Sequence, residues 1–112
     1  MVNQISYQMR NRVNWLFNDI CKLDNEFLNN INNKANDDPY FFVRTFQKWP
    51  IIRNAANELS LDEKKYLLCL IEDRINNSDN SVSTVMGIAY EAIYWMVDVE
   101  DKEQDLNNTV HI

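Results

Sequence analysis

Apolar residues recur every three or four positions through the first third of the chain, and this spacing constrains the fold more than any other feature. The apolar stripe consists of Ile5, Met9, Val13, Leu16, Ile20, Leu23, Phe27 and Ile31. Because a helix turns by about 100° per residue, these side chains fall along one side of it. The spacing predicts a long amphipathic N-terminal helix. Asp24 and Asn25 mark a place where that helix could break, with Asp24 capping a second segment.

The usual helix-ending residues are scarce, with one Gly and two Pro among 112 residues. Asn pairs take their place, because Asn tolerates the left-handed backbone conformation that closes a helix. Asp38 and Pro39 predict the start of a short helix that ends near Trp49, since Pro50 disfavours helical geometry in the residue before it. A further short helix, IIRNAANEL, is expected after Pro50.

Two more helices are expected in the second half. Ser60 and Glu63 have the spacing of a capping box before LDEKKYLLCLIEDRI. After the polar turn of residues 76–83, a last helix runs from Ser83 to Lys102. Its broad apolar side consists of Val85, Ala89, Ala92, Ile93, Met96 and Val99, widened by Ile88 and Trp95.

No segment shows the two-residue alternation of a strand. The sequence therefore predicts an all-α fold: a compact bundle of four to five helices, with a long N-terminal amphipathic helix and a largely buried C-terminal helix. Residues 1–104 are expected to form a single domain, and residues 105–112 a mobile C-terminal tail.

The two cysteines, Cys21 and Cys69, lie in apolar helical patterns without a CxxC pair. We expect both to be buried and reduced. The first residues lack the apolar region and cleavage site of a signal peptide, and the apolar runs are shorter than the roughly 20 residues of a membrane span. A cytoplasmic location without membrane contact is the resulting expectation.

Charge is distributed unevenly along the chain. Residues 1–53 contain seven Lys or Arg against five Asp or Glu, whereas residues 54–112 contain four against twelve, within a total net charge of −6. We predict an acidic partner-binding surface formed by Glu91, Tyr94, Asp98, Glu100, Asp101, Glu103 and Asp105. Such a surface attracts basic proteins and disfavours direct binding of duplex nucleic acid. The alternative is a solvated helix edge followed by a frayed tail.

A second candidate surface lies in the stretch YFFVRTFQKWPIIR, residues 40–53. On a helix, Phe42, Phe46 and Trp49 share the side expected to enter the core. The opposite side forms an aromatic–cationic patch of Tyr40, Phe41, Arg44 and Lys48. This patch could stack on a base and hold a phosphate, although ordinary packing with solvated cations explains it as well.

Catalytic motifs are missing. The single His, His111, is the penultimate residue and makes a poor fixed general base. One Gly cannot form GxGxxG or a Walker loop, and no His and carboxylate spacing predicts a metal site. No enzymatic activity, cofactor or metal is expected.

The function hypothesis is therefore a non-enzymatic small acidic protein that binds and inhibits or neutralises a basic partner. The partner would be a nucleic-acid-processing enzyme or a nuclease toxin, as for immunity proteins and phage inhibitors, because carboxylates can occupy positions meant for phosphates. The alternative is a self-associating helical structural or regulatory module, which would pair through the apolar stripe of the first helix and leaves a homodimer open.

Overall fold

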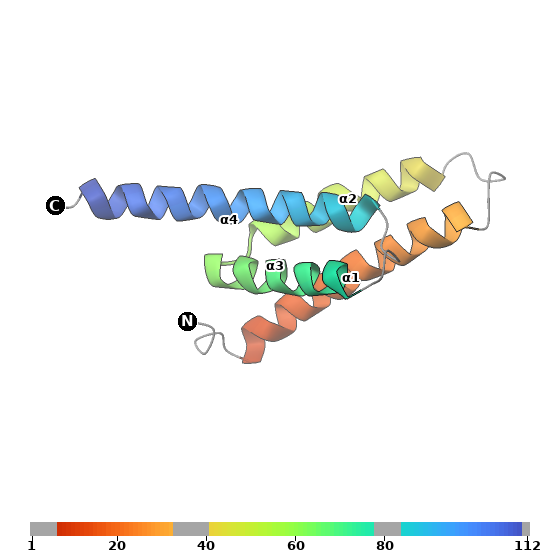
Figure 1. The fold of residues 1–112 in the computed structure, drawn as a ribbon, viewed down its shortest axis with the longest axis horizontal. Coiled ribbons are helices and arrows are strands. Elements are labelled where there is room, and N and C mark those ends of the chain that lie inside the picture. Colours follow the sequence, from red (N-terminus) through yellow and green to blue (C-terminus); the bar gives the residue numbers. More distant parts are fainter. Residues whose placement is uncertain (1–6, 33–40, 78–83, 111–112) are drawn as a thin grey trace.

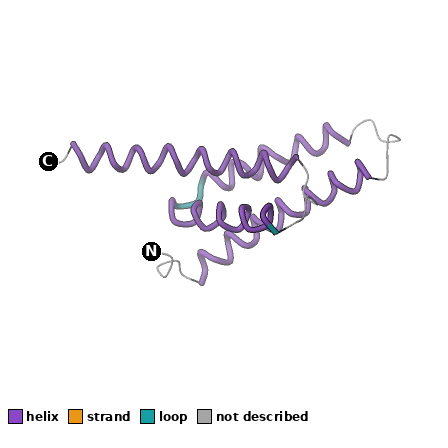
Figure 2. Tube along the Cα trace, viewed as in Figure 1, coloured by secondary structure: helices purple, strands orange, loops and turns teal. Residues whose placement is uncertain are grey.

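The computed structural model describes residues 7–32, 41–77 and 84–110, with side chains described for 7–29, 47–77 and 84–104. Four helices account for almost all of these residues: α1 (Tyr7–Asn32), α2 (Phe41–Asn57), α3 (Leu61–Asn76) and α4 (Thr84–Val110). Only the short link from α2 to α3 and the end of α3 appear as loop within these ranges, and no strand does (Figure 2). The predicted all-α bundle is confirmed, with four helices.

Successive helices run in opposite directions. In Figure 1, α1 and α3 run one way and α2 and α4 the other. The ion pair of Lys64 in early α3 with Glu100 in late α4 fits this antiparallel arrangement. The bundle is elongated, with extents of 61 × 24 × 24 Å. The C-terminal end of α4 projects beyond the other three helices (Figure 1).

The core is built from one side of each helix. The apolar stripe of α1 supplies Val13, Leu16, Ile20 and Leu23, all buried. The other three helices contribute Ile52, Ala56, Leu67, Ile71, Val85, Met86, Ala89, Ile93 and Val97. The aromatic ring of Trp49 packs against this core as predicted. The three-and-four spacing of α1 is thus used for packing within the chain.

The predicted break at Asp24 is wrong, because α1 is continuous from Tyr7 to Asn32. The Asp24 side chain is fully buried and caps no helix. Its carboxylate accepts a hydrogen bond from Arg74 of α3 at 3.2 Å. Arg74 also donates to the side-chain oxygen of Asn25 at 3.2 Å. A charge-assisted contact to another helix therefore stabilises the position where local sequence suggested an end.

The predicted helix end at Trp49 is also wrong, because α2 continues through Pro50 to Asn57. Proline removes one backbone hydrogen bond and frees the carbonyl four residues earlier. Pro50 itself is exposed. Ile52 and Ala56, buried in the turns after Pro50, anchor the second half of α2. Tertiary packing outweighs the local preference here.

The predicted capping box at the start of α3 is confirmed. Ser60 Oγ accepts from the backbone N–H of Glu63 at 3.2 Å, and the backbone N–H of Ser60 donates to Glu63 Oε1 at 3.0 Å. Arg12 of α1 lies 3.1 Å from the other carboxylate oxygen, Oε2. One buried carboxylate thus begins α3 and ties it to α1.

The last helix contacts all three others, as expected of a central element. Its solvent face is wider than predicted, because Ile88 and Trp95 are exposed and do not widen the buried side. The helix also runs to Val110, past the expected end at Lys102. Neither Gly nor Pro occurs between these positions, and the Asn pair at Asn107 and Asn108, of the kind expected to end a helix, does not stop it.

The two cysteines have different environments. Cys21 on α1 is partly buried against the core, and burial raises the pKa of its thiol, with Arg74 opposing and Asp24 reinforcing the shift. Cys69 on α3 is exposed, so the prediction that both would be buried is wrong for this residue. Its position lies on the side of α3 opposite to Leu67 and Ile71, which face the core. Both thiols are free.

Candidate protein-binding surface

One side of α4 carries aromatic and acidic side chains together, and we call Glu91, Tyr94, Trp95 and Asp98 the α4 face. At 100° per residue these four positions fall within roughly 100° of the helix circumference. The exposed fractions are 53% for Tyr94 and 67% for Trp95, and Glu91 is exposed beside them. Of Tyr90, Tyr94 and Trp95, the last two are therefore exposed to solvent.

The ring of Tyr94 stacks on another aromatic ring of the same helix. Tyr90, one turn earlier, stacks on it with ring centroids 6.1 Å apart and an interplanar angle of 24°. Tyr90 itself is half-buried and packs against the core. The half-buried ring of Tyr90 thus supports one side of the exposed Tyr94 ring.

Several predicted acidic residues face the bundle instead. Glu100 pairs with the buried Lys64, and Asp101 lies 3.2 Å from Lys65, so both join α4 to α3. Asp98 stays at the edge of the α4 face, where Lys102 of the next turn lies 3.1 Å from its carboxylate. The structure thus brings Glu91, Tyr94 and Asp98 together, and directs Glu100 and Asp101 toward α3.

The remaining predicted residues are only partly placed. Glu103 is exposed near the projecting end of α4, and the side chain of Asp105 lies outside the described residues. In the aromatic–cationic patch, Tyr40 and the side chains of Phe41 and Arg44 also lie outside them. Lys48 donates to Glu26 of α1 at 3.1 Å. That patch stays a prediction.

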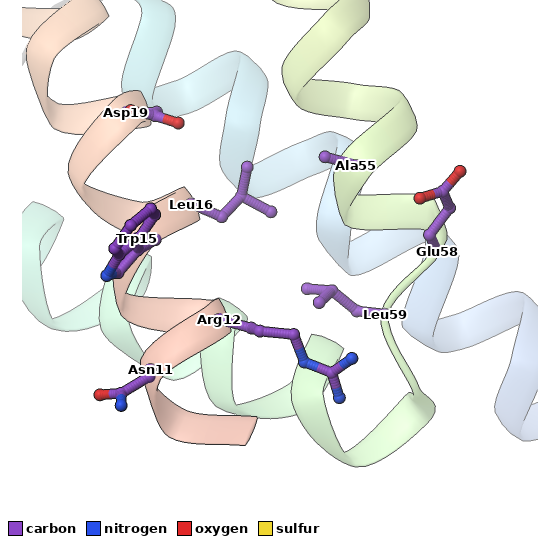
Figure 3. Close-up of a pocket in the computed structure, with 8 residues that line it drawn as sticks. All are labelled: Asn11, Arg12, Trp15, Leu16, Asp19, Ala55, Glu58 and Leu59. Atoms are coloured by element: carbon purple, nitrogen blue, oxygen red, sulfur yellow. The ribbon is translucent and has the colours of Figure 1, made fainter. Parts of the chain in front are cut away.

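Sequence reasoning missed a groove between α1 and α2. It contains an open hollow of about 620 Å³ near the end of α2, and a smaller one of about 250 Å³ further along. Figure 3 shows Leu16 and Leu59 in the space between the two helices. Trp15 on α1 also lines the larger hollow. The exposed fraction of Trp15 is 77%. The spacing of Tyr7, Asn11 and Trp15, four residues apart and off the apolar stripe, could have indicated this aromatic edge.

Two other kinds of site find no support in the described part of the chain. Among residues 7–32, 41–77 and 84–110, no group of three or more Cys, His, Asp or Glu side chains is arranged to hold a metal ion. Within the same ranges, no helix combines the length and the apolar character that crossing a bilayer requires.

Comparison of the chain with known protein families, with curated proteins and with solved structures finds no significant match.

Proposed function

We propose that this chain is a non-enzymatic acidic protein that docks on a basic partner protein through the α4 face and thereby inhibits or neutralises it. The observation that carries the proposal is the exposure of Tyr94 and Trp95 next to the carboxylate of Glu91. Exposed aromatic side chains on a rigid helix are typical anchors of protein interfaces, where a few such residues supply most of the binding free energy.

The charge of the molecule indicates the chemistry of the partner. The net charge of −6 favours approach of a basic surface and raises its rate of association. At the α4 face, a Lys or Arg of the partner would stack on Tyr94 or Trp95 and pair with Glu91. Since Asp98, Glu100 and Asp101 have intramolecular ion-pair partners, the aromatic rings contribute more here than the acidic run does. The basic surface of the partner, once covered by the α4 face, would no longer bind phosphate groups.

Self-association through the stripe of α1 is less well supported. Its residues Val13, Leu16, Ile20 and Leu23 are buried in the core of the same chain. They are therefore not available to a second copy unless the bundle opens.

The test is affinity capture from the native host with the wild type and two variants of equal net charge. Trp95→Ala/Glu91→Gln removes one exposed aromatic ring and one exposed carboxylate from the α4 face. Tyr7→Ala/Glu72→Gln makes the same kind of change on α1 and α3, where both side chains are also exposed. Circular dichroism confirms that each variant folds.

We expect the wild type and the Tyr7→Ala/Glu72→Gln variant to retain one stoichiometric basic protein, and the α4 variant to lose it. With that protein purified, the rate at which it associates with the chain should fall as the salt concentration rises. Salt shortens the Debye length and so screens the electrostatic attraction that brings the two proteins together. The partner's own activity should fall when the wild type is added. An acidic partner, or equal capture by both variants, would refute the proposal.

A further inference from the structure

The groove between α1 and α2 is a surface separate from the α4 face. Its two hollows both include Asp19 in their walls, so they lie in line along the groove. The α1 residues that line them run from Asn11 to Glu26. At 1.5 Å per residue this length is about 22 Å, or about four helical turns.

Each hollow has an apolar floor and an exposed apolar rim. In the larger, Leu16 and Leu59 form the floor and Trp15 stands at the edge. In the smaller, Leu23 and Ile52 lie beneath Ile51, of which 71% is exposed. Large apolar side chains exposed next to a concave surface mark a place where another molecule can bury them.

The charges of the larger hollow are mostly uncompensated carboxylates. Asp19 and Glu58 line it, and within the described part of the chain neither has an ion-pair partner. The one cation of this hollow, Arg12, already pairs with the buried Glu63. In the smaller hollow, the two cations Lys22 and Lys48 offset the two carboxylates Asp19 and Glu26. The groove is therefore acidic at one end and close to neutral at the other.

We propose that this groove binds a basic amphipathic helix of a partner protein. The helix would insert two apolar side chains seven residues apart, one into each hollow, and place Lys or Arg beside Asp19 and Glu58. Seven residues correspond to about 10 Å, the separation along α1 between Trp15 and Lys22, which line the two hollows. Two hollows in line between antiparallel helices suit the helix-in-groove mode of recognition.

Charge complementarity selects this occupant. A second copy of the chain would bring another net charge of −6 to an acidic site, and the two molecules would repel each other. A basic helix gains from both carboxylates and from the face of Trp15, which attracts cations. The inference does not rest on the proposed function, because the groove and the α4 face share no residue.

The experiment uses two synthetic helical peptides of about 15 residues, the length of about four turns. One has two Leu seven residues apart among Lys and Ala, and the other has Glu in place of every Lys. Binding to the full chain is measured by calorimetry. The indole N–H signals of Trp15 and Trp95 in NMR spectra report which surface is occupied.

We expect the basic peptide to bind and to shift the Trp15 signal, and the acidic peptide not to bind. Asp19→Asn/Glu58→Gln should weaken binding at least about tenfold, since two charge-assisted contacts are lost. The matched variant Glu72→Gln/Asp73→Asn makes the same change in net charge on the exposed side of α3 and should alter the affinity less than about twofold.

Three results would overturn the inference: no binding of the basic peptide, equal weakening by the two charge variants, or a shift confined to Trp95. Trp95→Ala/Glu91→Gln should leave peptide binding unchanged. Failure at the groove is therefore distinguishable from failure of the proposed function at the α4 face.

Discussion

The interface between α3 and α4 and the interface between α1 and α2 are both antiparallel helix pairs, yet one is closed and the other is open. At the closed interface, the side chain of Lys64 is only 1% exposed and pairs with Glu100. At the open one, the cross-helix ion pair of Lys48 with Glu26 is about half-exposed on both sides, and two hollows separate the helices.

The difference shows what a charged residue does in each setting. A buried ammonium must keep its carboxylate, because removing one partner leaves an unpaired charge away from water. This requirement fixes how α3 and α4 align. An exposed pair can separate into water at little cost and so fixes nothing. The alignment of α1 and α2 therefore depends on the buried apolar side chains between them, such as Leu23 and Ile52.

The largest expected effect comes from breaking the buried pair. Glu100→Ala leaves the Lys64 ammonium without its carboxylate and should lower the free energy of unfolding by about 3 to 5 kcal/mol. Urea denaturation followed by circular dichroism measures this change. Lys64→Met, which keeps the length of the side chain and removes the charge, should cost far less because Glu100 is one-third exposed.

The double variant Lys64→Met/Glu100→Ala is the control for this prediction. It should recover most of the stability lost in Glu100→Ala, since no buried charge remains unpaired. If Lys64→Met were as destabilising as Glu100→Ala, the pair itself, and not the unpaired ammonium, would hold α3 and α4 together.

The second largest effect is expected for a Leu→Ala substitution, whose cost should differ between the two interfaces. Leu67→Ala in α3 empties a fully buried site and should cost about 3 kcal/mol, including the cavity it leaves. Leu59→Ala, at the half-buried floor of the larger hollow, should cost about 1 kcal/mol, because much of that side chain already borders open space. Equal losses in urea denaturation would mean that the groove is as tightly packed as the core.

Sequence reasoning predicted the parts of this fold that depend on local patterns. The stripe of α1 and the capping box of Ser60 and Glu63 depend on residues three or four positions apart. It failed at Asp24 and Pro50, where contacts to other helices decide the outcome. Arg74 is 50 positions from Asp24, and no local pattern indicates that the two meet.

The same limit explains the candidate surfaces. The spacing of Glu91, Tyr94 and Asp98 predicted that they share one side of a helix. The ion-pair partners of Glu100 and Asp101 come from α3, so the sequence of α4 alone could not predict them. Beyond its aromatic edge on α1, the groove could not be predicted, because its two walls belong to separate helices. Trp15 was visible as an aromatic residue off the apolar stripe, but its exposure follows from how α2 packs beside α1.

The smallest expected effect tests whether burial alone separates the two interfaces. Lys65→Ala at the closed interface and Lys48→Ala at the open one each remove an exposed ion pair, with Asp101 and Glu26 respectively. Because all four side chains are about half-exposed, each change should cost less than about 1 kcal/mol. The loss of unfolding free energy should be smaller still in about 1 M salt, where charges are screened within about 3 Å. Urea denaturation at low and high salt measures both losses.

If Lys65→Ala were several times more destabilising than Lys48→Ala, then α3 and α4 would be held by a coupled network of Lys64, Lys65, Glu100 and Asp101. Similar small losses would leave the buried Lys64 as the residue that closes this interface.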